Sequence, residues 1–144
     1  MGRRLIYALI ASAVLLAAGY GCTGGGQNAS TGPEETVSAF YGALAEGHFD
    51  KASRLCDTLT MSGYIGRYAS EWDRMAMQAD SCTCAIACSI MTNMKTVIVS
   101  CGKKDDRTEV RYSLEASGYP QKNKKAVLRK EEGEWKIEAV TDDN

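Results

Sequence analysis

The spacing of the hydrophobic residues changes once along this chain, near residue 95, and this change limits the possible folds more than any other feature. Before it, apolar side chains recur every three or four positions, as on one face of an α-helix. After it, they alternate with polar residues, as in strands with one buried face. Helices followed by strands predict an α+β domain, with N-terminal helices packed on a curved antiparallel four-stranded sheet.

The helical part contains three apolar stripes. The first helix is expected to begin at Pro33 and to end at Gly47, because proline suits a first turn and glycine often follows a last one. Two stripes follow the i, i+3, i+4, i+7 pattern: Val37, Phe40, Tyr41 and Leu44, then Ala52, Leu55, Cys56 and Leu59. Ser62 and Gly63 are expected to break the helix before the third stripe. That stripe consists of Tyr64, Tyr68, Trp72, Met75, Ala79, Cys82, Ile86 and Ile90.

The second part of the chain contains alternating segments and a hairpin. Glu132 and Gly133 separate two such segments, which predicts a turn between two strands. The residues predicted to share the apolar faces of the strands are Val97, Val99 and Cys101, then Val110, Tyr112, Leu114 and Ala116, and finally Trp135, Ile137 and Ala139. The helices are expected to lie across the apolar face of the sheet.

The beginning of the chain has the pattern of an export signal. Arg3 and Arg4 precede a 16-residue uncharged stretch, which is shorter than a membrane-spanning helix. The residues "AAGYGC" at 17–22 resemble a bacterial lipobox, in which the signal is cleaved before a cysteine that receives lipid. The alternative is ordinary cleavage beside an incidental cysteine.

The lipobox resemblance implies a division of the chain into a lipoprotein signal peptide (1–21), a flexible tether (22–32) and a folded domain (33–144), with Cys22 as the lipidation site. Several acyl chains on one cysteine make a lasting membrane anchor, since each buried CH₂ contributes ~0.8 kcal/mol. By similarity to known sorting rules, Thr23 in place of an aspartate implies the outer membrane, facing the periplasm. The membrane, reached through this lipid anchor, is the first expected partner.

Two short motifs resemble a known family. "GHFDKA" (residues 47–52) fits the pattern G-x-F-x-K-A, and "GEWKI" (residues 133–137) fits G-x-W-K-I. Both are similar to segments of small bacterial lipoproteins with an NTF2-like (cystatin-like) domain of unknown function. The resemblance covers about residues 33–140 and implies a fold, not an activity.

The cysteines fall outside that resemblance. In an oxidising compartment the five cysteines other than Cys22 predict disulfide bonds, and the candidates are Cys56, Cys82, Cys84, Cys88 and Cys101. Bonds within the C-x-C-x₃-C cluster are strained or poorly directed, so bonds from the cluster to the other two cysteines are expected, with one thiol left over. The alternative is a thiolate metal site of the cluster and Cys101, although the paired C-x₂-C spacing of common zinc sites is absent.

The charge of the chain argues against a nucleic-acid partner. It has 17 basic and 18 acidic residues, with no concentrated basic face. The short basic run Lys122, Lys124 and Lys125 is interpreted as a solvated hairpin.

The resemblance also suggests where a ligand binds, because NTF2-like isomerases pair an acidic base with a tyrosine in the cone between helices and sheet. The candidate lining residues are Tyr41, Tyr64, Tyr68, Trp72, Met75 and Tyr112, and the alternative is that they form the core. No carboxylate lies on an apolar stripe, so no catalytic residue, metal ligand or cofactor is assigned. The leading hypothesis is a non-enzymatic envelope protein that binds a small ligand or an envelope protein. The alternative is an enzyme acting on a small apolar substrate in the cone.

Overall fold

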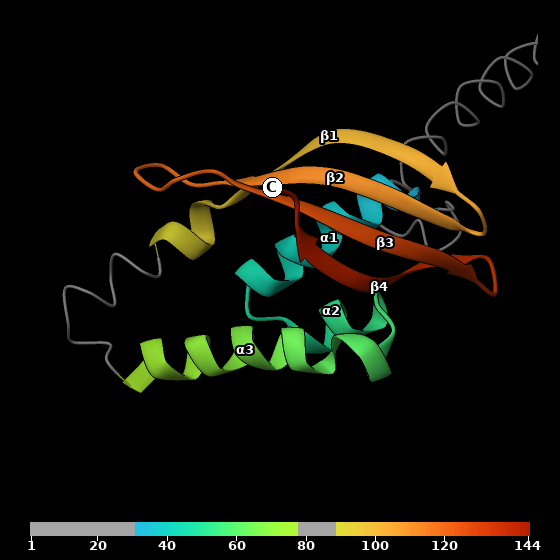
Figure 1. The fold of residues 1–144 in the computed structure, drawn as a ribbon. Coiled ribbons are helices and arrows are strands. Elements are labelled where there is room, and N and C mark those ends of the chain that lie inside the picture. Colours follow the sequence, from blue (N-terminus) through green and yellow to red (C-terminus); the bar gives the residue numbers. More distant parts are fainter. Residues whose placement is uncertain (1–30, 78–88) are drawn as a thin grey trace, which may run out of the picture.

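The computed structural model of this protein describes residues 31–77 and 89–144, which form two layers (Figure 1). One layer is a curved sheet of β1 (Lys95–Lys104), β2 (Arg107–Glu115), β3 (Lys122–Glu131) and β4 (Glu134–Asp142). The strands are antiparallel and lie side by side in sequence order. The other layer contains α1 (Pro33–Ala45), α2 (Phe49–Arg54) and α3 (Thr58–Met77). The predicted α+β class is therefore confirmed. Within the described ranges, no helix has the length and apolar character needed to span a membrane.

Helix α1 forms where the sequence predicts it and supplies the centre of the core. Pro33 occupies its first turn, and the Glu35 carboxylate accepts a hydrogen bond from the Gly32 amide at 2.6 Å. Carboxylates favour this end of a helix because its free amides carry partial positive charge. The predicted apolar stripe is buried, with Val37, Phe40, Tyr41 and Leu44 at most 1% exposed. Gly47, at φ +74°, follows the helix as expected.

The boundary between α2 and α3 differs from the prediction. Helix α2 ends at Arg54, and α3 begins at Thr58 and continues through Ser62 and Gly63. Asp57 caps α3, because its Oδ1 accepts hydrogen bonds from the Leu59 amide at 2.8 Å and the Thr60 amide at 3.3 Å. A glycine inside a helix costs about 1 kcal/mol relative to alanine, which the cap and the buried contacts of the helix offset.

This shift in the helix boundary also changes which residues are buried. Leu59, predicted on the apolar face, is 92% exposed, whereas Met61 and Ile65 of α3 are buried. The later members of the third stripe, Ala79, Cys82 and Ile86, lie outside the described residues.

The β2 strand and the final hairpin agree with the predicted pattern. Val110, Tyr112 and Leu114 of β2 are at most 6% exposed and face the helices. Glu132 and Gly133 form the turn between β3 and β4, with φ angles of 50° and 87°. Two successive positive φ angles are typical of the tight turns that match the twist of a hairpin.

Two β-bulges reverse the predicted alternation in the other strands. In β1 the pairing shifts between Ile98 and Ser100, which leaves Val99 as an extra residue. Ile98 packs against the core, while Val97 and Val99 are 41% and 67% exposed, contrary to the prediction. The extra residue shifts the alternation by one position, so Ile98 before the bulge and Cys101 after it pair with inward-facing residues of β2, and Val97 faces outward. Cys101, beyond the bulge, pairs with inward-facing Val110 but is exposed at the sheet edge.

The second bulge lies in β4, between Ile137 and Ala139. These residues pair with Leu128 and Val127, so Glu138 is the extra residue. Ile137 is fully buried, but beyond the bulge Val140 packs against the core in the place predicted for Ala139. Bulges bend the strand that carries them, which is consistent with the curvature of the sheet.

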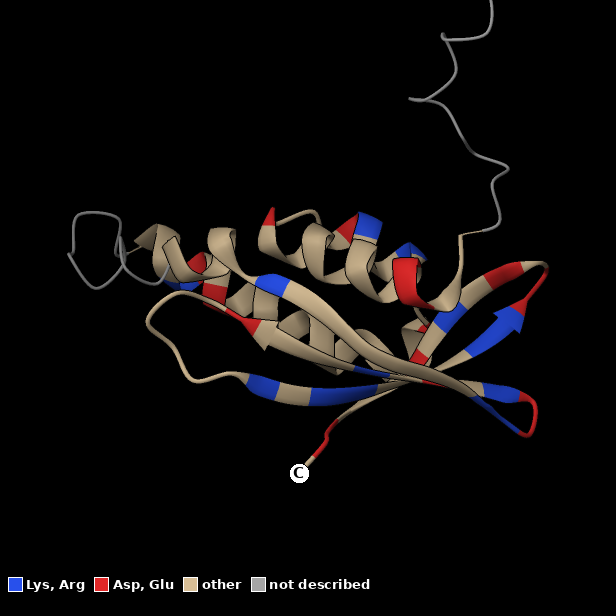
Figure 2. Ribbon diagram, turned by 90° about the horizontal axis from the view of Figure 1, so that it is seen from above, with Lys and Arg blue, Asp and Glu red and all other residues tan. Residues whose placement is uncertain are grey.

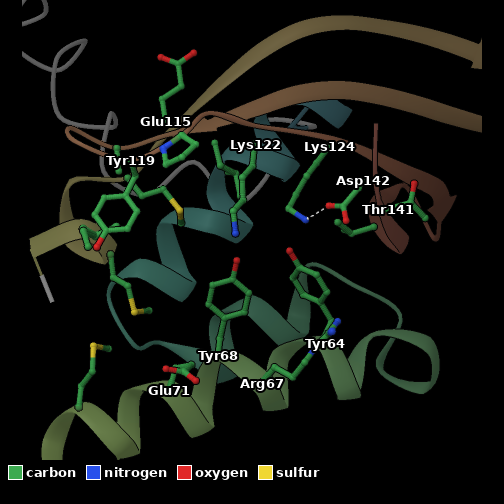
Figure 3. A pocket seen from close by; sticks show the side chains of 18 residues that line it. Tyr64, Arg67, Tyr68, Glu71, Glu115, Tyr119, Lys122, Lys124, Thr141 and Asp142 are labelled. Carbon is green, nitrogen blue, oxygen red and sulfur yellow. Dashed lines mark hydrogen bonds and ion pairs between the residues drawn. The ribbon is translucent and has the colours of Figure 1, made fainter. Parts of the chain in front are cut away.

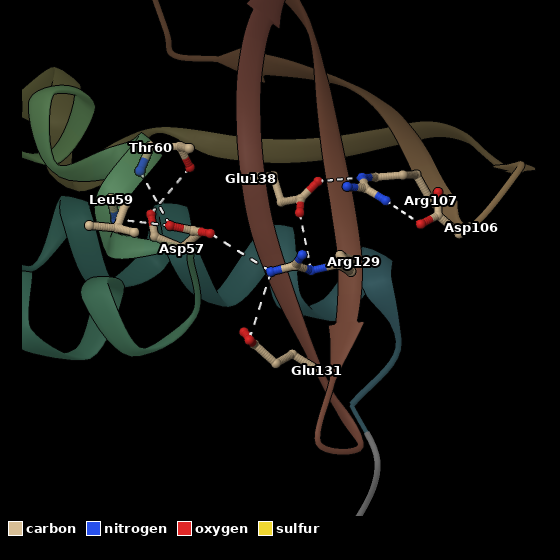
Figure 4. A network of polar contacts seen from close by, with 8 residues as sticks. All are labelled: Asp57, Leu59, Thr60, Asp106, Arg107, Arg129, Glu131 and Glu138. Carbon is tan, nitrogen blue, oxygen red and sulfur yellow. Dashed lines mark hydrogen bonds and ion pairs between the residues drawn. The ribbon is translucent and has the colours of Figure 1, made fainter.

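The bulged Glu138 also organises a network of ion pairs on the outside of the sheet (Figure 4). Its carboxylate lies 2.6 Å from Arg107 Nε of β2 and 3.1 Å from Arg129 Nε of β3. The Arg129 guanidinium extends to Asp57, the cap of α3, at 3.9 Å. Elsewhere, too, basic and acidic residues are interspersed over the helices and the sheet (Figure 2). Exposed pairs contribute little singly, so a contribution of this network to stability depends on its charges acting together.

The free edge of β4 is covered by the segment between α2 and α3. The Asp57 amide donates to the Ile137 carbonyl at 2.8 Å, and the Ile137 amide donates to the Leu55 carbonyl at 3.0 Å. These bonds place Cys56 against Ile137 and bury it. At Ile137, therefore, the edge of β4 offers no free backbone groups to another strand.

We expect Ile137→Ala and Leu59→Ala to differ sharply in their effect on stability. Ile137 is fully buried, so truncation should lower the free energy of unfolding by about 3 kcal/mol. Leu59 is 92% exposed, so its truncation should change that free energy by less than about 0.5 kcal/mol. Urea unfolding followed by circular dichroism measures both. Equal losses in the two variants would contradict the assigned start of α3.

Candidate functional site

A cavity of about 790 Å³ opens between α3 and the end of the sheet where β2 leads into β3 (Figure 3). Ligand-binding cavities commonly measure about 300–1,000 Å³. The apolar part of its wall consists of Met75, Ile90, Met91, Met94, Leu114, Ala116, Pro120 and Val140. Its polar part includes Tyr64, Arg67, Tyr68, Lys122, Lys124 and Asp142. A wall with an apolar part and a polar part suits a small molecule that is itself amphipathic.

The polar part of the wall is connected to the core by four neighbouring tyrosines, three of which are hydrogen-bonded in series. Tyr112 of β2 hydrogen-bonds to Tyr41 of α1 at 2.7 Å, and Tyr41 to Tyr64 of α3 at 2.6 Å. Tyr68, one turn further along α3, packs beside Tyr64, with the two ring centroids 5.5 Å apart. The hydroxyls of Tyr64 and Tyr68 point into the cavity (Figure 3). We call these residues the tyrosine chain.

Burial keeps the tyrosine chain in its neutral form. Loss of hydration raises the pKa of Tyr41, Tyr112 and Tyr68 well above the ordinary value. Neighbouring phenols raise the pKa of Tyr41 and Tyr68 further, whereas the hydrogen bond with Tyr41 partly lowers that of Tyr112. Burial also raises the pKa of Tyr64, although its hydrogen bonds with Tyr41 and Tyr68 partly offset this increase. At neutral pH all four hydroxyls are therefore available as hydrogen-bond donors.

The carboxylates of the cavity wall are largely paired. Lys124 Nζ donates to Asp142 Oδ1 at 2.7 Å, and this hydrogen bond lowers the pKa of Asp142. Glu71 accepts from Arg74 at 2.7 Å. An ionised, paired carboxylate of low pKa is a weak base.

Two cations of the wall are not paired in this way. The Arg67 guanidinium stacks over the Tyr64 ring, 5.3 Å from its centroid. Among the described residues, Lys122 has no carboxylate within 4 Å, and its ammonium group points toward the Tyr68 hydroxyl (Figure 3). The polar end of the cavity therefore presents hydrogen-bond donors.

The structure separates the predicted lining residues into three groups. Tyr64, Tyr68 and Met75 lie on the cavity wall. Tyr41 and Tyr112 do not; they are 1% exposed and lie behind the wall, inside the core. Trp72, contrary to the prediction, faces the end of α1, where its Nε1 donates to the Leu44 carbonyl at 2.9 Å. Trp72 lies four residues after Tyr68. Each residue of an α-helix turns the chain by about 100°, so Trp72 is rotated about 40° past Tyr68 around the helix axis, away from the cavity.

The sequence analysis missed the basic residues of the cavity. Lys122 and Lys124 were interpreted as solvated; Lys122 is indeed exposed and Lys124 is half-buried, but both also line the cavity. The signal was present, because strand alternation places them on the same face as Ala126 and Leu128, which are buried. Lys125, on the other face, lies 3.7 Å from Glu109. Residues 90–94 and the connection between β2 and β3 also line the cavity. Their place there depends on tertiary packing, and no sequence pattern indicated it.

The two described cysteines lie far apart and have free thiols. Cys56 is buried at the β4 edge, where burial raises its pKa to about 11, and Cys101 is exposed on β1 at the opposite edge. Three inter-strand spacings of ~4.8 Å separate these edges, too far for a disulfide between the two cysteines. Met77 is the last described residue before the predicted partner Cys82. Helix α3 has 20 residues and places Met77 about 30 Å from Cys56.

The predicted partners Cys82, Cys84 and Cys88 lie outside the described residues, so the disulfide bonds remain predictions, as does the metal site. Within the described residues, no three His, Cys, Asp or Glu side chains converge as metal ligands do.

Comparison with solved structures returned an NTF2-like protein of unknown function from Cytophaga hutchinsonii, with 14% sequence identity and a TM-score of 0.44. The match covers 76% of this chain and 88% of that protein. No protein-family model and no curated protein matches the chain. A likeness this low carries no argument about function, so the interpretation of the site depends on its own geometry.

We expect the free energy of unfolding to decrease as pH rises above about 10, the ordinary pKa of tyrosine. The folded state raises the pKa of all four phenols, so they stay protonated while those of the unfolded chain ionise. The contribution of the buried phenols to stability is complete below about pH 10. Above pH 10 the free energy of unfolding falls by about 1.4 kcal/mol per pH unit for each such phenol. Tyr41→Phe should reduce the slope by about that amount. Urea unfolding at several values between pH 8 and 10.8 measures it, and identical slopes in both proteins would refute the prediction.

Proposed function

We propose that this protein is a lipid-anchored component of a bacterial envelope whose domain binds a small, largely apolar ligand in the cavity beside α3. The observation that carries the proposal is the cavity itself, with its volume of about 790 Å³, its methionine-rich wall and its polar end of tyrosine and lysine. Unbranched methionine side chains adapt to ligands of irregular shape.

The arrangement of charges supports binding rather than catalysis. General-base chemistry at neutral pH needs a carboxylate with a raised pKa within hydrogen-bond reach of the reacting atoms. Asp142 has a lowered pKa and is bonded to Lys124, and Glu71 is bonded to Arg74. The enzyme hypothesis is therefore the weaker of the two.

The positions of the two family-like motifs support an NTF2-like assignment of the domain. Residues 47–52 form the turn after α1 and the start of α2, and residues 133–137 span the last hairpin and the start of β4. Both segments form turns between elements of the core. Residues at such positions determine the fold, as expected for motifs that are shared by a fold family.

The lipid anchor is proposed from the sequence alone. Residues 1–30 lie outside the described part of the chain, and the first described helix begins at Pro33. A cleaved signal before Cys22, acylation of that cysteine and a flexible tether would hold the domain at the periplasmic face of the outer membrane.

The ligand hypothesis is tested with N-phenyl-1-naphthylamine, an uncharged probe whose fluorescence rises in apolar surroundings. The protein is the mature chain from residue 22 with Cys22→Ser, so that no lipid competes for the probe. We expect saturable binding, and we expect Ala116→Trp, which places an indole in the cavity, to weaken it about tenfold or more. The control is Ala76→Trp, on the exposed surface of α3. Absence of binding, or equal binding by the two variants, would refute the hypothesis.

The anchor is tested by intact mass spectrometry of the protein extracted from native membranes, alkylated with and without prior reduction. We expect loss of residues 1–21 and an acyl mass on Cys22, and the number of thiols that alkylate only after reduction counts those held in disulfide bonds. Cys22→Ala should leave the protein uncleaved and without acyl mass. A mature chain without lipid would refute the anchor, and five freely alkylated thiols would refute the disulfides.

A further inference from the structure

The protons of the tyrosine chain determine the direction of its hydrogen bonds. Each phenol carries one hydroxyl proton, and two hydrogen bonds connect the hydroxyls of Tyr112, Tyr41 and Tyr64, so one of these three protons is left over. The position of this remaining proton decides which ligand atoms the cavity can satisfy.

Tyr112 forms the closed end of the tyrosine chain. It is 1% exposed, and within the described ranges its hydroxyl has one hydrogen-bond partner, Tyr41. If Tyr112 only accepted, its own proton would be buried without an acceptor, which is the costlier arrangement. Tyr112 therefore donates to Tyr41. Because Tyr41 also has a single proton, it donates to Tyr64.

The same argument continues to the open end of the chain. The proton of Tyr64 is the one left over, at the wall of the cavity. Hydrogen bonds in series polarise one another, so the Tyr64 hydroxyl is a stronger donor than an isolated phenol. One turn further along α3, the Tyr68 hydroxyl also points into the cavity (Figure 3), where it can donate to a ligand.

A second donor lies beside it. The ammonium group of Lys122 points toward the Tyr68 hydroxyl (Figure 3) and has no carboxylate within 4 Å among the residues described. A protonated lysine donates and never accepts. The two side chains come from opposite layers, α3 and β3, and meet at the polar end of the cavity.

The nearby carboxylates do not supply the missing acceptor. Asp142 is bonded to Lys124 at 2.7 Å, and Glu71 to Arg74 at 2.7 Å. The Glu115 side chain points away from Tyr68 (Figure 3) and accepts from the Ser113 hydroxyl at 3.0 Å. Two donors at one end of an apolar cavity require a ligand group that only accepts.

We propose that the cavity takes amphipathic carboxylates, with the carboxylate between Tyr68 and Lys122 and the apolar tail along Met75, Met91, Met94 and Leu114. This preference for carboxylates presupposes the ligand-binding function proposed above for the same cavity. An ionised carboxylate accepts at both oxygens and carries the charge that Lys122 complements. An amine head group presents only donors to the same site and is rejected.

Three ligands with the same tail test this specificity: decanoate, 1-decanol and decylamine, each below its micelle concentration at pH 7.5. Displacement of bound N-phenyl-1-naphthylamine from the mature Cys22→Ser chain gives the three affinities. We expect decanoate to bind about tenfold or more tightly than 1-decanol, since two charge-assisted hydrogen bonds form, and decylamine to bind most weakly.

Two variants connect the preference to the proposed donors. Lys122→Gln and Tyr68→Phe should each reduce the ratio of decanoate to decanol affinity about tenfold, while decanol affinity stays within about threefold. The matched control is Lys103→Gln, an exposed strand lysine outside the cavity, which should leave the ratio unchanged. Each ratio compares two ligands on the same variant. A variant that is partly unfolded binds both ligands less, so the ratio is unaffected.

The outcomes separate the two hypotheses. Equal affinity for acid and amine, or a ratio unaffected by both variants, would overturn the carboxylate specificity while leaving ligand binding intact. Binding of the probe without displacement by any of the three ligands would also overturn it. Failure of the wild-type chain to bind the probe would overturn the proposed function itself.

Discussion

The hydroxyl group of Tyr41 imposes the constraint on which the rest of this structure depends. It lies at the centre of the core, where an unpaired hydroxyl would cost about 1–3 kcal/mol. Its partners come from both layers, Tyr112 of the sheet at 2.7 Å and Tyr64 of α3 at 2.6 Å. The three side chains can meet only if α1 lies between β2 and α3, so satisfying this one group fixes how the helices sit on the sheet.

The same chain of hydroxyls divides the interior into a dry part and an open part. On the α1 side, Val37, Phe40 and Leu44 fill the space against β2 and leave nothing for a ligand. On the α3 side, the tyrosines give way to methionines and to the ends of β3 and β4, and a cavity of about 790 Å³ remains. The polar end of the cavity is thus an extension of the core, not a feature added to the surface. Changing the cavity and destabilising the core are coupled for this reason.

The bulges connect the shape of the sheet to the composition of its two faces. Glu138, the extra residue of β4, shifts Val140 to the cavity side and holds Arg107 and Arg129 on the outer side. Without that shift, strand alternation would place Ala139 toward the helices and Val140 toward solvent. One inserted residue therefore contributes both an apolar wall residue and the centre of an ion-pair network.

The sequence by itself determined what depends on near neighbours: the buried stripe of α1, the alternation in β2, and the turn at Glu132 and Gly133. Period and turn chemistry are local properties, so they can be read from the order of residues. It also identified Tyr64 and Tyr68 as candidates for a cavity wall, but it placed Trp72 there wrongly and missed Lys122. Tertiary structure decided the start of α3, the two bulges and the meeting of Lys122 with Tyr68, because each depends on contacts between segments far apart in the chain. Local patterns carry no record of such contacts, since the energy that selects them arises only when the layers pack.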